Sequence, residues 1–205
     1  MSRGAALGWL FLLGAYHGIN PGMGWLFAVA LGMQEKRARA VVRALGPIAL
    51  GHAGAIGAVI ALAGFVQILL SLNHLKVVVA LLLMALGVYR IVRSRHWVWG
   101  GMQVGFWELS FWSFLMASAH GAGLMVLPVV LTLPAGHHTH GSFQDPATAV
   151  WATLIHTLGY LTFTAVIALL VYQKLGLALL RKAWFNLDLV WAVALIITGL
   201  VALAI

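Results

Sequence analysis

Four histidines lie inside segments that are apolar enough to cross a membrane: His17, His52, His120 and His156. Ionisable residues at membrane depth are costly and rare, so they mark functional sites by default. An imidazole can bind a transition metal or relay a proton near neutral pH. A single histidine of this kind is best explained by a hydrogen bond to a neighbouring helix, but four in a repeated pattern favour a function.

The pattern is a matched spacing in the two halves of the chain. His17 and His52 are 35 residues apart, and His120 and His156 are 36 residues apart. His17 and His120 fall near the middle of their spans, whereas His52 and His156 fall nearer to opposite membrane faces. The spacing predicts a ladder of rings across the membrane. His17 and His120 would bind an ion at its centre, and His52 and His156 would act as gates or proton partners.

A break is predicted in the first span at Asn20, Pro21 and Gly22. Proline removes a backbone donor and clashes with the preceding helical turn. Non-helical backbone at membrane depth survives only against protein or a wet cavity, where Asn20 would add a side-chain oxygen. Gly121, Gly123 and Pro128 predict a looser break in the second half. The alternative is a simple proline kink with glycines that allow close helix packing.

A histidine-rich loop, PAGHHTHGSFQDP, contains His137, His138 and His140. Three imidazoles within four residues can chelate a divalent ion. The spacing of a closed four-ligand zinc site is missing, so the loop predicts metal contact at the outer surface. The alternative is a flexible polar turn.

The composition places these residues in an all-α integral membrane protein. Of the 205 residues, 63% are hydrophobic and 8% are charged, and the mean hydropathy is +1.02. A soluble domain has roughly a quarter of its residues charged. The net charge of +8 is interpreted as a topology signal and not as a nucleic-acid surface. No cysteine is present, which excludes disulfides and thiolate sites. Nucleophilic hydrolysis lacks an acid placed to orient a histidine, so we do not expect an enzyme.

Six stretches are long enough to span a bilayer. They are residues 5–33, 46–72, 75–92, 106–133, 147–172 and 187–205. With the N-terminus outside, ten of the twelve lysines and arginines fall on the cytoplasmic side, as expected in an inner membrane. Residues 1–205 then form one membrane domain. Its halves, residues 1–96 and 106–205, have three spans each and must point in opposite directions, an inverted repeat with its site near the midplane.

Residues 18–64 resemble the lysine exporter superfamily: a Pro-Gly break is followed by a basic loop and a glycine-rich second span. The resemblance implies six spans in two inverted three-helix repeats. Members include nickel/cobalt exporters, amino-acid exporters and thiol-disulfide electron carriers. The nickel/cobalt branch is typified by a membrane histidine and a histidine-rich loop. His17 matches that histidine, and Asn20 stands where an acidic residue is expected. The electron carriers need paired cysteines, which this chain lacks.

Together these features predict a transporter for a transition-metal cation, nickel, cobalt, copper or zinc, because imidazole suits these ions and the acidic residues fall at or near span ends. The predicted mechanism is alternating access, with protonation of the ligands releasing the metal. Two alternatives remain open: export of a small organic solute such as an amino acid, and a non-transporting accessory subunit or assembly factor of a metalloenzyme. The expected partners are lipid, the metal ion, and a second copy or another membrane subunit, without nucleic acid.

Overall fold

The computed structural model describes residues 3–92, 105–132, 146–175 and 187–204. Almost all of these residues are helical and none of them forms a strand, which confirms the all-helical prediction for this part of the chain. The helices in chain order are α1 (Arg3–Ile19), the 3-10 helix η1 (Pro21–Met23), α2 (Trp25–Glu35), α3 (Ala38–Leu69), α4 (Leu72–Val92), α5 (Phe106–Ala119), α6 (Ala122–Leu131), α7 (Pro146–Leu170), the π-helical turn η2 (Val171–Leu175) and α9 (Leu187–Ala204).

Several helices have the length and apolar character of membrane spans. Within the described residues, three stretches are each long and apolar enough to cross a membrane: α3, α4 and Ala147–Lys174. The helices α5 and α6 together form a fourth such stretch, which is bent by 61°. The helices α1 and α9 are shorter and apolar. Large apolar side chains cover the outside of the molecule, with Ile68 and Trp107 exposed by 78% and 73%. Soluble proteins rarely expose large continuous apolar surfaces, whereas such a surface suits lipid.

The first expected span is interrupted at Asn20, where α1 has just ended. The Asn20 side-chain oxygen accepts a hydrogen bond from the Gly22 backbone N–H at 2.9 Å and caps η1. Pro21 begins η1, a position where its missing N–H is not needed. Gly24 then adopts φ 133°, a conformation that residues with a Cβ rarely reach. Local chemistry therefore builds this break.

The second predicted break lies at Gly121 and not at Pro128. The chain bends at His120 and Gly121, between α5 and α6. Gly121 has φ 71° and ψ 26°, the left-handed conformation that commonly ends a helix. Pro128 lies buried inside α6, which continues past it to Leu131 although a proline removes one helical hydrogen bond.

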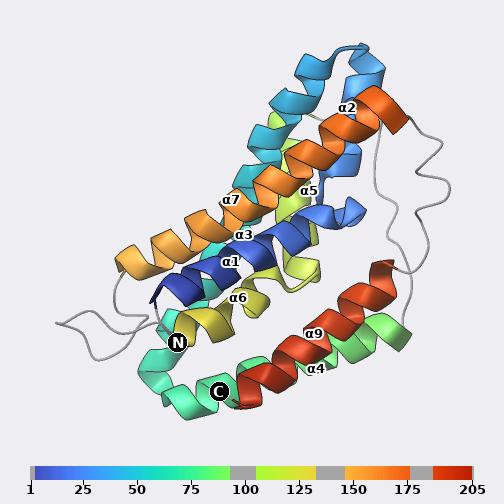
Figure 1. The fold of residues 1–205 in the computed structure, drawn as a ribbon. Coiled ribbons are helices and arrows are strands. Elements are labelled where there is room, and N and C mark those ends of the chain that lie inside the picture. Colours follow the sequence, from blue (N-terminus) through green and yellow to red (C-terminus); the bar gives the residue numbers. More distant parts are fainter. Residues whose placement is uncertain (1–2, 93–104, 133–145, 176–186, 205) are drawn as a thin grey trace.

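The main helices pack in three pairs: α1 with α7, α3 with α5, and α4 with α9. Figure 1 shows α4 and α9 side by side along one edge of the molecule, and they contact the other helices chiefly through α6. Glycines allow the closest approach within this pair. A Cβ added at Gly87 would lie 2.8 Å from the Ala192 oxygen. One added at Gly199 would lie 2.9 Å from the Ala80 oxygen.

Candidate metal-binding histidine cluster

Three of the four membrane histidines meet in the protein interior. His17 from α1, His52 from α3 and His156 from α7 are each fully buried. Their ring centroids are 4.9 Å apart for His17 and His156, 5.7 Å for His17 and His52, and 5.5 Å for His52 and His156. These three residues are called the histidine cluster below.

Glycines let α1 and α7 approach closely enough for His17 and His156 to meet. A Cβ added at Gly14 would collide with the backbone oxygen of His156, and one at Gly159 would collide with that of Phe11. These two glycines therefore set the contact of α1 with α7. On α3, a Cβ at Gly51, the residue before His52, would collide with the backbone oxygen of Ser110, so this glycine sets the contact of α3 with α5 instead.

The prediction that His52 and His156 lie at opposite depths is wrong, because their rings lie side by side with planes 5° apart. Depth was counted along each span at the helical rise of about 1.5 Å per residue. Such counting gives a position along one helix and not the positions of two helices relative to each other. Because α3 and α7 pack against each other, the rings of His52 and His156 reach the same place.

The ring nitrogens of the histidine cluster are mostly without hydrogen-bond partners. His17 Nδ1 lies 2.8 Å from the Leu13 carbonyl. A carbonyl only accepts, so Nδ1 carries the proton and Nε2 keeps its lone pair. His17 Nε2 and both ring nitrogens of His52 and His156 have no hydrogen-bond partner. The Leu10 carbonyl faces the His156 ring without a hydrogen bond of ordinary geometry. Leaving a buried polar group unpaired costs about 1–3 kcal/mol, so this arrangement calls for a ligand.

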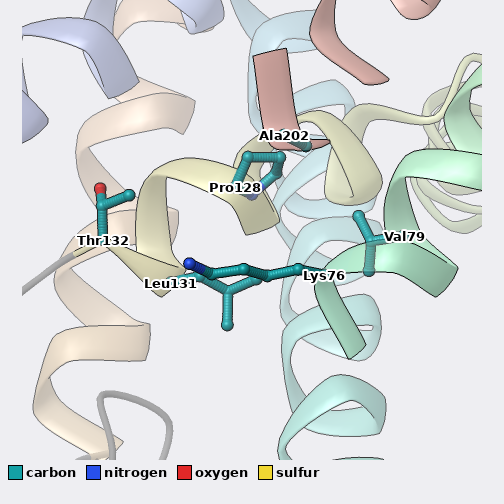
Figure 2. Close-up of a pocket in the computed structure, with 6 residues that line it drawn as sticks. All are labelled: Lys76, Val79, Pro128, Leu131, Thr132 and Ala202. Carbon is teal, nitrogen blue, oxygen red and sulfur yellow. The ribbon is translucent and has the colours of Figure 1, made fainter. Parts of the chain in front are cut away.

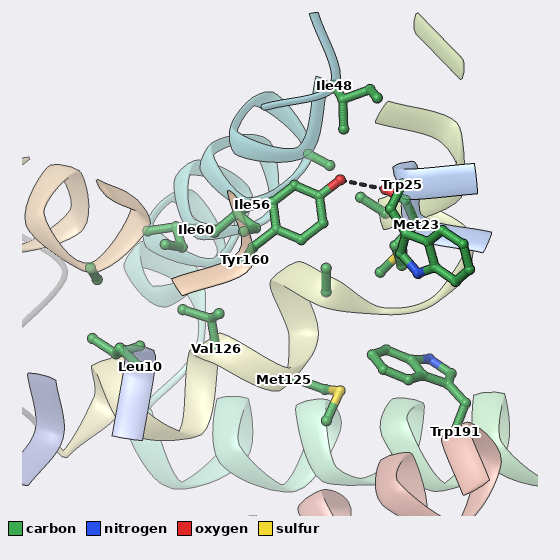
Figure 3. Packing of buried hydrophobic residues seen from close by; sticks show 14 of the residues in the cluster. Leu10, Met23, Trp25, Ile48, Ile56, Ile60, Met125, Val126, Tyr160 and Trp191 are labelled. Atoms are coloured by element: carbon green, nitrogen blue, oxygen red, sulfur yellow. Dashed lines mark hydrogen bonds between the residues drawn. The ribbon is translucent and has the colours of Figure 1, made fainter. Parts of the chain in front are cut away.

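Tyr160 supports the histidine cluster from one side. Its ring stacks on His52 with centroids 3.8 Å apart and planes 9° apart. Its hydroxyl donates a hydrogen bond to the Met23 carbonyl in η1, which Figure 3 shows as a dashed line. The hydroxyl is therefore directed at the first helix break and not at the histidine nitrogens. Tyr160 therefore links His52, on which its ring stacks, to the backbone of that break, to which its hydroxyl is hydrogen-bonded.

Trp191 of α9 covers the cluster from another side. Its ring is nearly perpendicular to the His17 ring, with centroids 4.6 Å apart, and lies parallel to the Tyr16 ring at 4.9 Å. It also meets His120 at 5.6 Å. Among the ring contacts of the described residues, none joins His120 to a member of the histidine cluster. The predicted central pair of His17 and His120 is therefore joined through Trp191.

His120 has a local setting like that of His17 in another tertiary environment. Its Nδ1 lies 2.8 Å from the Met116 carbonyl, four residues earlier, so its Nε2 also keeps the lone pair. A Cβ added at Gly22 would lie 3.8 Å from this Nε2 and 3.3 Å from the Asn20 side-chain oxygen. The two predicted ligands His120 and Asn20 thus face the same glycine, where the two helix breaks meet.

At the two breaks, backbone carbonyls that lack a helical partner accept hydrogen bonds from side chains. Trp25 Nε1 donates to the Ile19 oxygen at 2.9 Å. Arg90 Nη2 donates to the Ala119 oxygen at 2.8 Å, and Trp191 Nε1 donates to the His120 oxygen at 2.9 Å. A bound solute would have to compete with these donors for the same lone pairs. The broken helix ends are consequently held by the protein itself.

As the rings stand, no three histidine or carboxylate side chains in the described residues are placed to hold a metal ion. No hydrogen bond holds the rings of His52 and His156 in their present orientation. The two acidic side chains described, Glu35 and Glu108, are exposed, and Glu35 pairs with Arg43 at 2.7 Å. His137, His138 and His140 lie outside the described residues.

A small hollow lies apart from the cluster, where α4, α6 and α9 meet (Figure 2). It has room for about one water molecule. Its lining is Lys76, Val79, Pro128, Leu131, Thr132 and Ala202. With this size and lining, the hollow is not a second candidate for the ion site.

Sequence reasoning missed the aromatic residues around the histidine cluster. Tyr160 follows His156 by four residues, which places both on one helix face, and that spacing could have shown it. Tyr16 precedes His17 directly. Trp191 gave no comparable signal, because it lies near the start of its span, and tryptophans in membrane proteins gather at span ends.

The fold and the site together define a class: a helical protein with several helices long and apolar enough to span a membrane and a buried three-histidine cluster between them. Comparison of the chain with family models, with curated proteins and with solved structures finds no match.

Proposed function

We propose that this protein moves a transition-metal cation, nickel, cobalt, copper or zinc, across a membrane, with His17, His52 and His156 as its central binding site. The observation that carries the proposal is the burial of three adjacent imidazoles whose nitrogens, the Nδ1 of His17 excepted, have no hydrogen-bond partner. Imidazole is a good ligand for these four metals and a poor one for magnesium or calcium.

The spacing of the rings supports a shared ion. A metal–nitrogen bond is about 2 Å and the ring centre lies about 1 Å beyond the nitrogen, so ligands near the tetrahedral angle have centres about 5 Å apart. The three centroid distances, 4.9, 5.5 and 5.7 Å, are close to this value. The bond from His17 Nδ1 to the Leu13 carbonyl is the outer-shell contact typical of metal-binding histidines.

Two inverted repeats and six crossings form the framework that we propose for transport. The crossings are α1 with α2, α3, α4, α5 with α6, α7 and α9, with the N-terminus outside an inner membrane. The helix pairing supports the repeat. In the proposed repeat α1 corresponds to α5, α3 to α7, and α4 to α9. The α1–α7 pair then corresponds to the α5–α3 pair, and the α4–α9 pair corresponds to itself. The contacts of Gly87 with Ala192 and of Gly199 with Ala80 are reciprocal, as a two-fold axis between α4 and α9 requires.

In this mechanism the ion binds the histidine cluster from one side and leaves by way of His120 and Asn20 towards the other. Protons compete with the ion for the same nitrogen lone pairs, so protonation would release it. Export of an amino acid has less support, because the carbonyls at Ile19, Ala119 and His120 already accept hydrogen bonds from protein side chains.

The proposal is tested by metal binding to the purified protein in detergent. Wild-type protein should bind about one ion per chain, and His17→Ala should lose it, because three ligands and an open position are the usual minimum for such a site. His74→Ala is the matched control, since His74 is exposed on α4 and bonds only Ser71 among the contacts described. Equal metal content in wild type and His17→Ala, by elemental mass spectrometry, would refute the proposal.

A further inference from the structure

Among the ring contacts of the described residues, Trp191 alone meets both the histidine cluster and His120. It is 2% exposed, near the start of α9. The plane of its ring makes an angle of 81° with the His17 ring and of 74° with the His120 ring. Figure 3 shows Trp191 among the buried hydrophobic residues of the core. An ion that passes from the cluster to His120 would meet this ring.

The chemistry and packing of Trp191 make it a barrier and not a ligand. Its Nε1 donates a hydrogen bond to the His120 oxygen, and an indole nitrogen has no lone pair to offer a metal ion. Its ring lies parallel to Tyr16 with planes 6° apart, so Tyr16 covers one of the faces to which a cation would be attracted. The buried ring therefore offers an ion chiefly steric resistance.

Hydrogen bonds hold Trp191 in this place and join α9 to α1 and to the second helix break. Trp191 Nε1 donates to the His120 oxygen at 2.9 Å, at the second break. The Tyr16 hydroxyl donates to the backbone oxygen of Val190 at 3.3 Å. Arg90, on the partner helix α4, donates to the Ala119 oxygen at 2.8 Å. The α4–α9 pair otherwise contacts the remaining helices chiefly through α6. These few bonds are what a movement of the pair would have to break.

We propose that Trp191 is the gate between the histidine cluster and His120, an inference that rests on the proposed transport function. With its hydrogen bond to His120 formed, the ring separates the two ligand positions. When the α4–α9 pair moves away from the second break, the bond breaks and the ring withdraws with α9. The passage of the ion is thereby coupled to the movement of one helix pair.

The test compares Trp191→Ala and Trp191→Phe with Trp9→Ala, a control at a tryptophan that is 56% exposed on α1. Two quantities are measured with nickel, cobalt, copper and zinc salts in turn: equilibrium binding in detergent, and passive flux down a metal gradient in proteoliposomes. Trp191→Ala should raise the flux by about tenfold, because it removes both the ring that blocks the passage and the hydrogen bond that holds it. Trp191→Phe keeps most of the ring but lacks the donor, and should raise the flux less.

Metal binding should stay within about threefold of wild type in all three variants, because no cluster ligand is changed. Retained binding also shows that a variant is folded. Flux in both Trp191 variants equal to that of Trp9→Ala would overturn the gate. Loss of binding in Trp191→Phe would also overturn it, since Trp191 would then be part of the binding site. Wild-type protein that neither binds nor moves any of the four metals would instead refute the proposed function, and the gate with it.

Discussion

His17 and His120 share a local design, but only His17 belongs to a cluster. Each ring has its Nδ1 at 2.8 Å from the carbonyl four residues earlier, and each lies at or just before a helix break. Three residues before His17 stands Gly14, whereas three residues before His120 stands Ala117. A Cβ at Gly14 would collide with the His156 backbone, so its absence admits α7. The comparison teaches that the same local motif joins a cluster only where the neighbouring helices bring other histidines to it.

The largest effect is expected from exchanging the two histidines in turn for alanine. His17→Ala should weaken metal binding by about 100-fold or more, above the range typical of outer-shell partners. His120→Ala should weaken it by less than about tenfold, because its ring contacts no member of the histidine cluster among the described contacts. Titration calorimetry on both purified variants measures the difference. Equal losses in the two would show that His120 binds the ion together with His17.

The two helix breaks differ in the strain that their glycines carry. Gly24→Ala should destabilise the fold by about 3 kcal/mol, because φ 133° suits glycine almost alone. Its added Cβ would also lie 2.7 Å from the Ile48 side chain. Gly121→Ala should cost about 1–2 kcal/mol, since φ 71° lies in the left-handed helical region.

Thermal unfolding in detergent measures both variants, and Gly46→Ala is the control because no atom lies within 4 Å of an added Cβ there. A larger shift for Gly121→Ala than for Gly24→Ala would reverse the assignment of the more strained break.

Gly14→Ala would make the first half resemble the second at the position that distinguishes them. The added methyl group must push α7 from α1, which should destabilise the protein by about 2 kcal/mol and weaken metal binding. Gly8→Ala, on the same helix with open space around it, should instead stabilise by about 0.5–1 kcal/mol. The melting temperatures of the pair should therefore move in opposite directions. Similar shifts for both would mean that the α1–α7 approach does not depend on Gly14.

The smallest effect is expected from Tyr160→Phe, which removes the hydrogen bond between Tyr160 and the first break and keeps the ring that stacks on His52. Loss of the hydrogen bond to the Met23 carbonyl should cost about 1 kcal/mol of stability. The ring that stacks on His52 remains, so metal affinity should be nearly unchanged. Tyr89→Phe is the control, because Tyr89 is 53% exposed. A large loss of affinity in Tyr160→Phe alone would place its hydroxyl at the ion.

Much of the local structure could be predicted from the sequence. The scarcity of charge predicts apolar helices, and the structure has them. Asn20, Pro21 and Gly22 predict the first break because capping, a missing N–H and backbone freedom are properties of the residues themselves. Of the residues that predicted the second break, Gly121 lies at the bend, whereas Pro128 lies inside α6, because a proline only weakens a helix locally.

The sequence by itself determined that the buried titratable groups are histidines, that they recur at a matched spacing, and that glycines lie close to them along the chain. Only the tertiary structure decided which histidines meet. Spacing along a helix follows from its constant rise, but the sideways approach of two helices depends on every side chain between them. The rings of His52 and His156 contact His17, and the ring of Trp191 contacts both His17 and His120. Each of these contacts joins helices that are far apart in the chain.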